Sequence, residues 1–133
     1  MQEWIYYDSK TGNVDRFVHK LAEATGWHIT KIDEHTKAMH PGHLITFTTG
    51  FGQVPPKTDA FMSNNADYVQ TVSVSGNRNW GANFGKAGDT LADRYCLPLL
   101  MKFELSGNGR EVQEMINKIN EYHHDYETMD IAQ

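Results

Sequence analysis

The length, composition and charge of the chain describe an ordinary globular protein of one domain. Its 133 residues can bury a single core, and 39% of them are hydrophobic and 22% are charged. Twelve basic residues against seventeen acidic ones give a net charge of −5, which argues against a nucleic-acid-binding protein, because such proteins usually carry a basic stripe.

The first third of the chain predicts a strand, a helix and a second strand. Residues 3–7 are rich in aromatic side chains and predict a strand. From Asn13 onward, apolar side chains recur at the spacing of one helix face, and Gly26 is placed to end that helix. Its apolar positions are Val14, Phe17, Val18, Leu21 and Ala22. Residues 27–32 alternate and predict a short edge strand.

The rest of the chain continues this alternation. Strands are expected over residues 43–48, 68–75 and 98–104, and a short helix over residues 57–63. Apolar residues at helical spacing predict two more helices. The first contains Phe84, Ala87, Gly88, Leu91, Ala92 and Tyr95, and the second directs Val112, Met115, Ile116 and Ile119 inward.

The order of these elements predicts an α/β fold. Five strands and about four helices in alternation indicate a parallel sheet that is covered on both faces, with right-handed crossovers. We expect the domain to span residues 1–125 and a loose C-terminal tail to span residues 126–133.

Three loops of similar composition follow strands of the predicted sheet. In an open parallel sheet, ligands bind beyond the carboxyl ends of the strands, where the strand order reverses. This rule selects residues 8–13, 48–55 and 75–81, which are all rich in Gly, Ser, Thr and Asn. Any one loop could be glycine-rich only to turn tightly. Because three such loops meet at one edge, the sequence predicts a ligand site there.

The first loop has the groups needed to hold a phosphate. Ser9 and Thr11 offer hydroxyls, and Gly12 and Asn13 open a helix whose first N–H groups are free. These groups and the helix dipole can bind a phosphate with few cations, which suits a phosphate that stays bound as part of a cofactor. The alternative is a plain helix cap, because Ser, Thr and Asn are common in caps.

The other two loops could contact a flat ring. Backbone groups of the second loop could form hydrogen bonds with a ring edge, and the glycines on either side of Phe51 would let a peptide change orientation. In the third loop, Trp80 and Phe84 lie beside glycines. The alternative places Trp80 in the core or in a lid, and Phe84 in the core at the start of its helix.

Several motifs of other protein classes are absent from the sequence. It contains neither the G-x-x-x-x-G-K-[ST] phosphate loop nor a G-x-G-x-x-G motif after the first strand. Thr48 and Thr49 stand where a phospho-receiver module would need an aspartate, and Cys96 is far from the first loop, where a cysteine phosphatase would need it. No pair of residues suggests a general acid and base, so we expect no catalytic side chain.

The sequence contains seven histidines, which raises the question of whether some of them bind a metal ion. His40 and His43 are separated by two residues, and His123 and His124 are adjacent, but no carboxylate or cysteine completes a recognisable set. We therefore expect surface histidines and no metal site.

The cellular location is predicted from the lack of membrane-span and signal-peptide features and from the cysteine content. No apolar run approaches the roughly 18 residues of a membrane span, and residues 1–4 lack the features of a signal peptide. Cys96 is the only cysteine, which excludes an internal disulfide. We expect a cytoplasmic protein that binds neither membranes nor nucleic acid.

Four segments in order resemble a known family. The segments "YDSKTGNV", "TTGFGQVP", "SGNRNWGANFGKAGD" and "KFELSG" are similar to those of the NrdI family, the flavodoxin-like accessory proteins of class Ib ribonucleotide reductase. The resemblance covers about residues 4–120. It implies a flavodoxin-like three-layer fold of strand order 2-1-3-4-5, with FMN between strands one and three; flavodoxin is itself a known example of the edge rule used above.

The resemblance also implies a function. Reduced FMN would react with molecular oxygen, and the superoxide or peroxide formed would pass to the small, radical-bearing subunit of class Ib ribonucleotide reductase to assemble its dimanganese–tyrosyl radical cofactor. The protein would then be an accessory flavin redox protein, not an enzyme, served by an unidentified electron donor. The alternatives are a general electron-transfer flavodoxin and a cofactor-free binding module.

The residues implied to bind FMN belong to the same three loops. The phosphate would be held by Ser9, Lys10, Thr11, Gly12, Asn13 and Val14. The flavin ring would be bordered near its N5 edge by Thr48, Thr49, Gly50, Phe51 and Gly52, and the other wall formed by Ser75, Gly76, Asn77, Trp80, Gly81 and Phe84.

Two departures from ordinary flavodoxins bear on this expectation. Val14 replaces a hydroxyl residue, so one phosphate bond must come from backbone alone. The second and third loops are also less acidic than in ordinary flavodoxins, which should make a flavin anion less costly.

Overall fold

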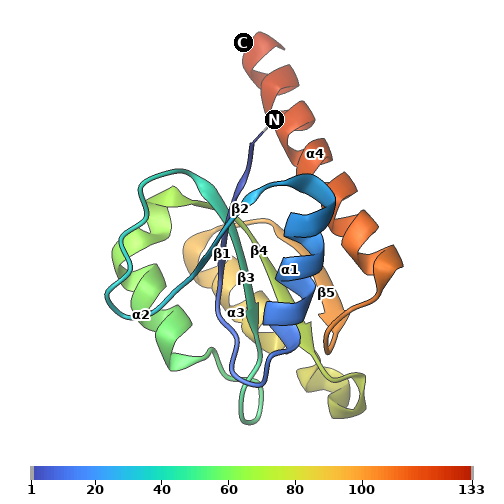
Figure 1. The fold of residues 1–133 in the computed structure, drawn as a ribbon. Helices are drawn as coiled ribbons and strands as arrows, with labels where there is room; N and C mark the ends of the chain where they lie inside the picture. The colour runs from blue at the N-terminus through green and yellow to red at the C-terminus, as the bar shows by residue number, and fades with distance from the viewer. Residues whose placement is uncertain (1, 133) are drawn as a thin grey trace.

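The protein is a three-layer α/β domain, shown as a ribbon in Figure 1. The computed structural model describes the backbone of residues 2–132 and the side chains of residues 2–124. The strands are β1 (Trp4–Tyr7), β2 (His28–Lys31), β3 (Gly42–Phe47), β4 (Val69–Gly76) and β5 (Leu99–Glu104). They form one parallel sheet in the order β2-β1-β3-β4-β5, which confirms the predicted fold class and strand order.

Helices cover both faces of this sheet. They are α1 (Asn13–Thr25), α2 (Pro56–Asn65), α3 (Lys86–Tyr95) and α4 (Gly109–Ala132), with short 3-10 helices η1 (Ala66–Tyr68) and η2 (Arg78–Asn83). The pairs α1 with α4 and α2 with α3 pack on opposite faces, as Figure 1 and the two hydrophobic clusters agree. No helix within residues 2–132 is both long enough and apolar enough to cross a membrane.

Each face of the sheet has its own hydrophobic core. On the first face, the predicted apolar side of α1 is buried, and Phe17 stacks on Phe103 of β5 with ring centroids 4.0 Å apart. On the second face, Phe61 of α2 and Leu91 of α3 pack against Leu44 in the middle of the sheet. The periodic apolar patterns of the sequence therefore identified the buried helix faces correctly.

Several helix boundaries differ from the expected ones, and α2 spans Pro56–Asn65 instead of residues 57–63. The third long helix begins at Lys86 and not at Phe84, because Gly85 before it has the left-handed conformation (φ +62°) and Phe84 is extended. The last helix continues to Ala132, through residues for which the sequence predicted a loose tail. The division of the chain at residue 125 stays a prediction.

The strand order determines where a ligand can bind. From β1 the chain crosses to β2 on one side, whereas β3 pairs with β1 on the other side. The loops that follow β1 and β3 therefore diverge at the carboxyl edge and leave a crevice between them.

Candidate functional site

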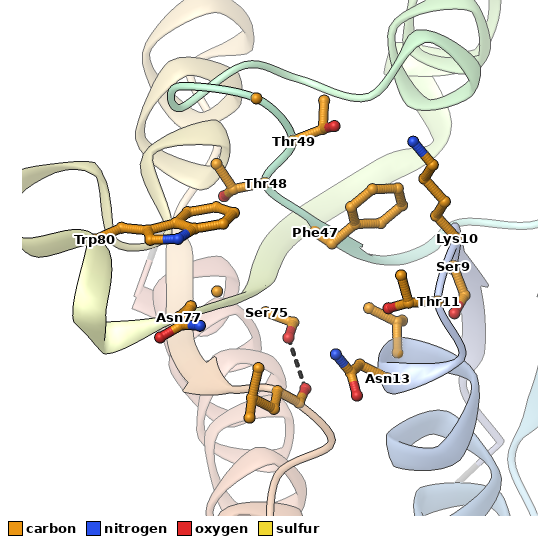
Figure 2. A pocket seen from close by; sticks show the side chains of 14 residues that line it. Ser9, Lys10, Thr11, Asn13, Phe47, Thr48, Thr49, Ser75, Asn77 and Trp80 are labelled. Carbon is orange, nitrogen blue, oxygen red and sulfur yellow. Dashed lines mark hydrogen bonds between the residues drawn. The ribbon is translucent and has the colours of Figure 1, made fainter.

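A cavity of about 310 Å³ opens at this carboxyl edge. Loops after β1, β3, β4 and β5 contribute to it, and Figure 2 shows the side chains that surround it. It is lined by Ser9, Lys10, Thr11, Asn13, Val14, Phe47, Thr48, Thr49, Gly50, Ser75, Gly76, Asn77, Trp80 and Leu105. The structure thus brings together most of the residues that we expected from three separate loops.

The loop after β1 presents free backbone donors to the cavity. Gly12 has the left-handed conformation (φ +93°), and its carbonyl accepts the first helical bond of α1, from the Arg16 N–H (3.0 Å). Ser9 Oγ accepts a hydrogen bond from the Asp15 N–H (3.2 Å). Within the described part of the chain, no hydrogen bond engages the N–H groups of residues 11–14.

Both interpretations of this loop hold in part. Ser9 is a cap for α1, but its hydroxyl only accepts in that bond, so its own proton can be donated to a ligand oxygen. The four unused N–H groups lie at the positive end of the helix dipole. The loop is therefore a candidate anion site as well as a helix start.

A second cation near this loop was missed in the sequence. Arg16 donates from Nη2 to Asn13 Oδ1 (2.8 Å) and from Nε to Ser106 Oγ (2.9 Å). A Cβ added at Gly12 would lie 2.8 Å from Arg16 Nη1, so the guanidinium lies directly against the loop. Helical spacing was the available signal, because Arg16 follows Gly12 by about one turn. Figure 2 shows the Lys10 side chain extending away from Asn13.

A buried carboxyl group lies beside the start of the loop. Asp8 directly follows β1 and does not line the cavity. Its Oδ2 accepts a hydrogen bond from Thr58 Oγ1 (2.9 Å), which in turn contacts Thr46 Oγ1 (2.7 Å). Burial raises the pKa of Asp8 above its usual value, although the Thr58 bonds and the charge of Lys57 act in the opposite direction. Asp8 lies in the loop expected to bind a ligand, but it was not among the residues expected to contact the phosphate.

The loop after β3 is a tight turn with an exposed tip. The N–H of Thr49 donates to Gln53 O (2.9 Å) and the N–H of Gln53 donates back to Thr49 O (2.7 Å). Thr48, Thr49 and Gly50 border the cavity, whereas Phe51 at the tip is 89% exposed and lies outside it. Gly52 also lies outside the lining, where its missing side chain leaves room for Lys86.

The loop after β4 forms the opposite wall. Ser75 Oγ donates to Leu105 O (2.6 Å), which ties this wall to the loop after β5. Trp80 is 43% exposed, and in Figure 2 its indole and the ring of Phe47 lie on different sides of the cavity. Phe47 and Leu105 line the cavity but were not expected to.

Two other expected residues of this wall lie behind it. Gly81 and Phe84 are not part of the lining. A Cβ at Gly76 would lie 2.8 Å from Gly85 N and 3.1 Å from the Phe84 ring, so Phe84 and its neighbour support the wall from outside. Phe84 is half-buried and belongs to neither hydrophobic cluster, so its role as a ligand contact or as a core residue stays a prediction.

The lining suits a ligand with one anionic end and one flat end. Hydroxyl and backbone N–H groups gather around α1, and the two aromatic rings lie further along the same cavity. Lys10 is the one ionisable side chain among the described lining residues. Among the described lining residues there is no pair of groups suited to acid–base catalysis.

Comparison with known proteins agrees with this geometry. The model of a family described as NrdI, flavodoxin-like, matches residues 5–117, which include all three cavity loops after β1, β3 and β4. The chain belongs to the NrdI family. This finding confirms the family resemblance that was based on four short segments.

Solved structures show that this chain has the fold of flavodoxins. Flavodoxin 2 from Bacillus cereus is 16% identical with a TM-score of 0.67, and 94% of this chain covers 99% of that one. A flavodoxin from Streptococcus pneumonia TIGR4 is 21% identical with a TM-score of 0.66, and the match covers 94% of this chain and 99% of that one. A short-chain flavodoxin associated with a bacterial microcompartment is 18% identical with a TM-score of 0.65, and the match covers 92% of this chain and 95% of that one. At these identities, the likeness concerns the fold alone.

The expectation that the histidines lack a carboxylate partner is wrong. His43 is buried, at 1% exposure, and together with His123 it contacts the carboxylate of Glu3. Glu3 and His43 are 40 positions apart in the chain, His43 and His123 are 80 apart, and Glu3 and His123 are 120 apart. Local sequence spacing therefore could not reveal this cluster. The cluster lies at the amino ends of β1 and β3, away from the cavity.

Proposed function

We propose that the protein binds FMN in this cavity and supplies an oxidant, made from molecular oxygen, to the small subunit of class Ib ribonucleotide reductase. The observation that carries the proposal is the row of unused N–H groups over residues 11–14, which opens into a cavity with two aromatic rings in a member of the NrdI family. The proposed setting is the cytoplasm, with a separate electron donor that reduces the protein.

The phosphate of FMN would be held mainly by neutral donors. Hydroxyls of Ser9 and Thr11 and the N–H groups at the start of α1 would contact its oxygens, with Arg16 adding positive charge beside Gly12. The Val14 side chain is 1% exposed and packs in the core, so Val14 can offer only its N–H. This supports the expectation that backbone alone replaces the missing hydroxyl.

The flavin ring would occupy the aromatic part of the cavity. Trp80 and Phe47 offer ring faces, and the backbone of residues 48–50 offers polar groups for a ring edge. When bound, FMN supplies the redox chemistry by passing electrons to oxygen. No carboxylate is among the described lining residues, so a negatively charged flavin ring would not be repelled by a carboxylate of the lining.

The exposed turn after β3 suits contact with a partner protein. Phe51 at its tip is a large apolar side chain with almost full exposure, directly beside residues that border the cavity. Exposed aromatic side chains are frequent anchors of protein–protein interfaces. We propose that the small subunit docks over this turn and thereby receives the oxidant close to where it forms.

Reconstitution of the partner tests this function. The FMN-loaded protein is reduced, mixed with the manganese-loaded small subunit and exposed to oxygen, and the tyrosyl radical is measured by electron paramagnetic resonance. The expected result is a radical signal that free reduced FMN or an ordinary flavodoxin does not produce.

The same assay separates the alternative function. The flavodoxin-like fold of the structural neighbours favours a general electron-transfer flavodoxin as the second candidate. An equal radical yield with an unrelated flavodoxin would favour that candidate. If Phe51→Ala lowered the yield without changing FMN binding, the docking part of the proposal would be supported.

A further inference from the structure

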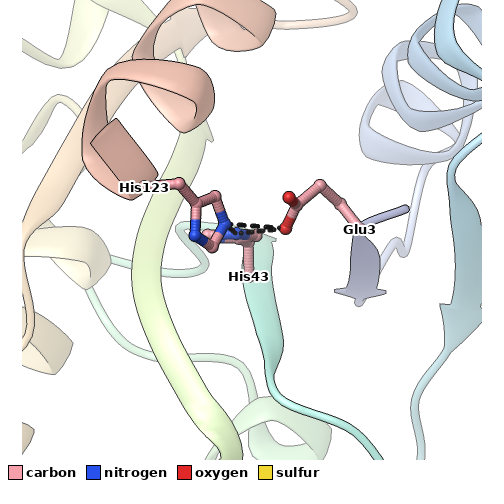
Figure 3. Close-up of side chains that lie close together, drawn as sticks. All are labelled: Glu3, His43 and His123. Carbon is pink, nitrogen blue, oxygen red and sulfur yellow. Dashed lines mark hydrogen bonds and ion pairs between the residues drawn. The ribbon is translucent and has the colours of Figure 1, made fainter. Parts of the chain in front are cut away.

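A second cluster of functional side chains lies at the opposite end of the sheet from the cavity. Glu3 immediately precedes β1, His43 belongs to β3 and His123 belongs to α4, and Figure 3 shows the three side chains directed toward one another. Their ligand atoms all lie within 4.8 Å of one another. We propose that Glu3, His43 and His123 bind a divalent transition-metal ion.

The distances within this cluster are those of neighbouring ligands on one metal ion. Glu3 Oε1 lies 3.1 Å from His43 Nε2 and 2.8 Å from His123 Nε2, and the two Nε2 atoms are 3.3 Å apart. Zinc binds imidazole nitrogen and carboxylate oxygen at about 2.0–2.2 Å, so adjacent ligands at octahedral or tetrahedral angles are about 2.8–3.6 Å apart. An ion therefore fits between the three atoms with little movement of their side chains.

Hydrogen bonds alone can also hold this triangle. If both Nε2 atoms carry protons, both N–H groups can donate to Glu3 Oε1, because one carboxylate oxygen can accept two hydrogen bonds. If the Nε2 atoms instead lack their protons, their lone pairs and the carboxylate all face the space that a cation would occupy. Metal titration therefore separates the two states of the cluster.

The surroundings hold the ligands in position. His43 Nδ1 lies 2.8 Å from the buried Thr71 Oγ1, and when that nitrogen carries the proton, Nε2 is left free to bind. The His43 side chain is 1% exposed and that of Glu3 is 6% exposed, whereas His123 at 20% leaves a route for the ion. The ring of Tyr122 packs edge-on against both histidines.

Binding of an ion at the cluster depends on the ionisation of its ligands. A metal ion needs neutral imidazoles and an ionised carboxylate, so it would compete with protons for all three side chains.

The ligand types indicate which ions fit. Two imidazoles with one carboxylate suit Zn²⁺, Co²⁺ and similar ions better than Ca²⁺ or Mg²⁺, which prefer oxygen ligands. Three protein ligands also leave a further coordination position for water. A bound ion would join β1, β3 and α4, which are far apart in the sequence.

Metal titration of the untagged, metal-depleted protein tests this inference. Zn²⁺ binding is measured by calorimetry, and Co²⁺ binding by its visible absorption bands. The expected result is about one ion per chain, with an affinity that falls at least about tenfold in His123→Ala, since even loss of an outer partner of a ligand can cost that much. The matched control is His124→Ala, which removes the neighbouring exposed histidine and should leave the affinity unchanged.

Two further comparisons keep the test decisive. Glu3→Gln preserves side-chain size and should also lower the affinity, and circular dichroism verifies that each variant is folded. The inference is overturned if the wild-type protein binds neither ion, if His123→Ala and Glu3→Gln bind as tightly as wild type, or if His124→Ala weakens binding equally. Binding is measured without FMN, so the result does not depend on the function of the cavity.

Discussion

Single residues of the first loop combine a structural role with a proposed binding role. Ser9 caps α1 through its oxygen and keeps its proton available, whereas Thr11 is exposed and has no other partner in the described hydrogen bonds. Removing the Ser9 hydroxyl would change both the helix start and the site. Thr11 therefore offers the cleaner test of phosphate binding.

We expect Thr11→Val to weaken FMN binding without changing stability. The substitution keeps the shape of the side chain and removes one hydroxyl donor, which should cost about 1 kcal/mol, or about five- to tenfold in affinity. Quenching of flavin fluorescence measures the dissociation constant. Thr90→Val, on α3 and outside the cavity, is the matched control. An unchanged affinity in Thr11→Val would remove this hydroxyl from the site.

The buried carboxyl group of Asp8 should make the stability of the protein depend on pH in an unusual direction. Because its pKa is raised on folding, the folded protein holds this proton more tightly than the unfolded chain, whose value is near 3.8. Its contribution to stability is therefore fully present below that value and is lost as pH rises through the raised pKa. Asp8→Asn removes the ionisation while keeping an acceptor for Thr58.

The free energy of unfolding in urea measures this effect. Asp8→Asn should gain stability relative to wild type as the pH is raised from 4 to 7, because only the wild-type carboxyl group becomes charged in its buried position. An equal difference between the two proteins at both pH values would show that the buried carboxyl group does not cause the dependence.

At the level of elements, contacts between distant parts of the chain carry the architecture. Phe17 of α1 and Phe103 of β5 are both fully buried and stack face to face, next to Gly107, where a Cβ would lie 2.6 Å from the Phe17 ring. This contact holds the start of α1 against the loop after β5. The loop after β1, which is proposed to hold the phosphate, therefore rests on a well-packed part of the core.

A pair of phenylalanine substitutions tests this contact. Phe103→Ala should lower the free energy of unfolding by about 3–5 kcal/mol, because it leaves a cavity in the core. Phe51→Ala makes the same chemical change at an exposed tip and should alter it by less than about 0.5 kcal/mol. Urea unfolding of both variants gives the comparison, and similar effects at the two positions would contradict the packing described here.

Elements with a strong periodic pattern could be predicted from sequence, and others could not. The apolar spacing of α1 predicted the correct buried face because burial requires it, whereas the strand order was implied only by the family resemblance. The start of α3 was predicted two residues too early, because Phe84 fits the helical spacing while the left-handed Gly85 interrupts the helix. The backbone conformation of a single glycine does not alter an apolar pattern.

At the scale of the whole molecule, the sheet brings distant residues together at both of its ends. The carboxyl edge was predictable, because a general rule places loops after parallel strands side by side. Phe47 and Leu105 were missed since an apolar residue at a strand end does not reveal whether it faces core or cavity. The cluster of Glu3, His43 and His123 was missed because it depends on which strands are neighbours.

FMN binding is the claim on which the proposed function depends. The first measurement is the visible absorption spectrum of the freshly purified protein, followed by titration of FMN into any colourless protein. We predict flavin bands, or quenched flavin fluorescence, that saturate at about one FMN per chain, because the cavity combines phosphate donors with aromatic walls. A colourless protein that leaves the fluorescence of added FMN unchanged would contradict the account and leave the first loop as a helix cap alone.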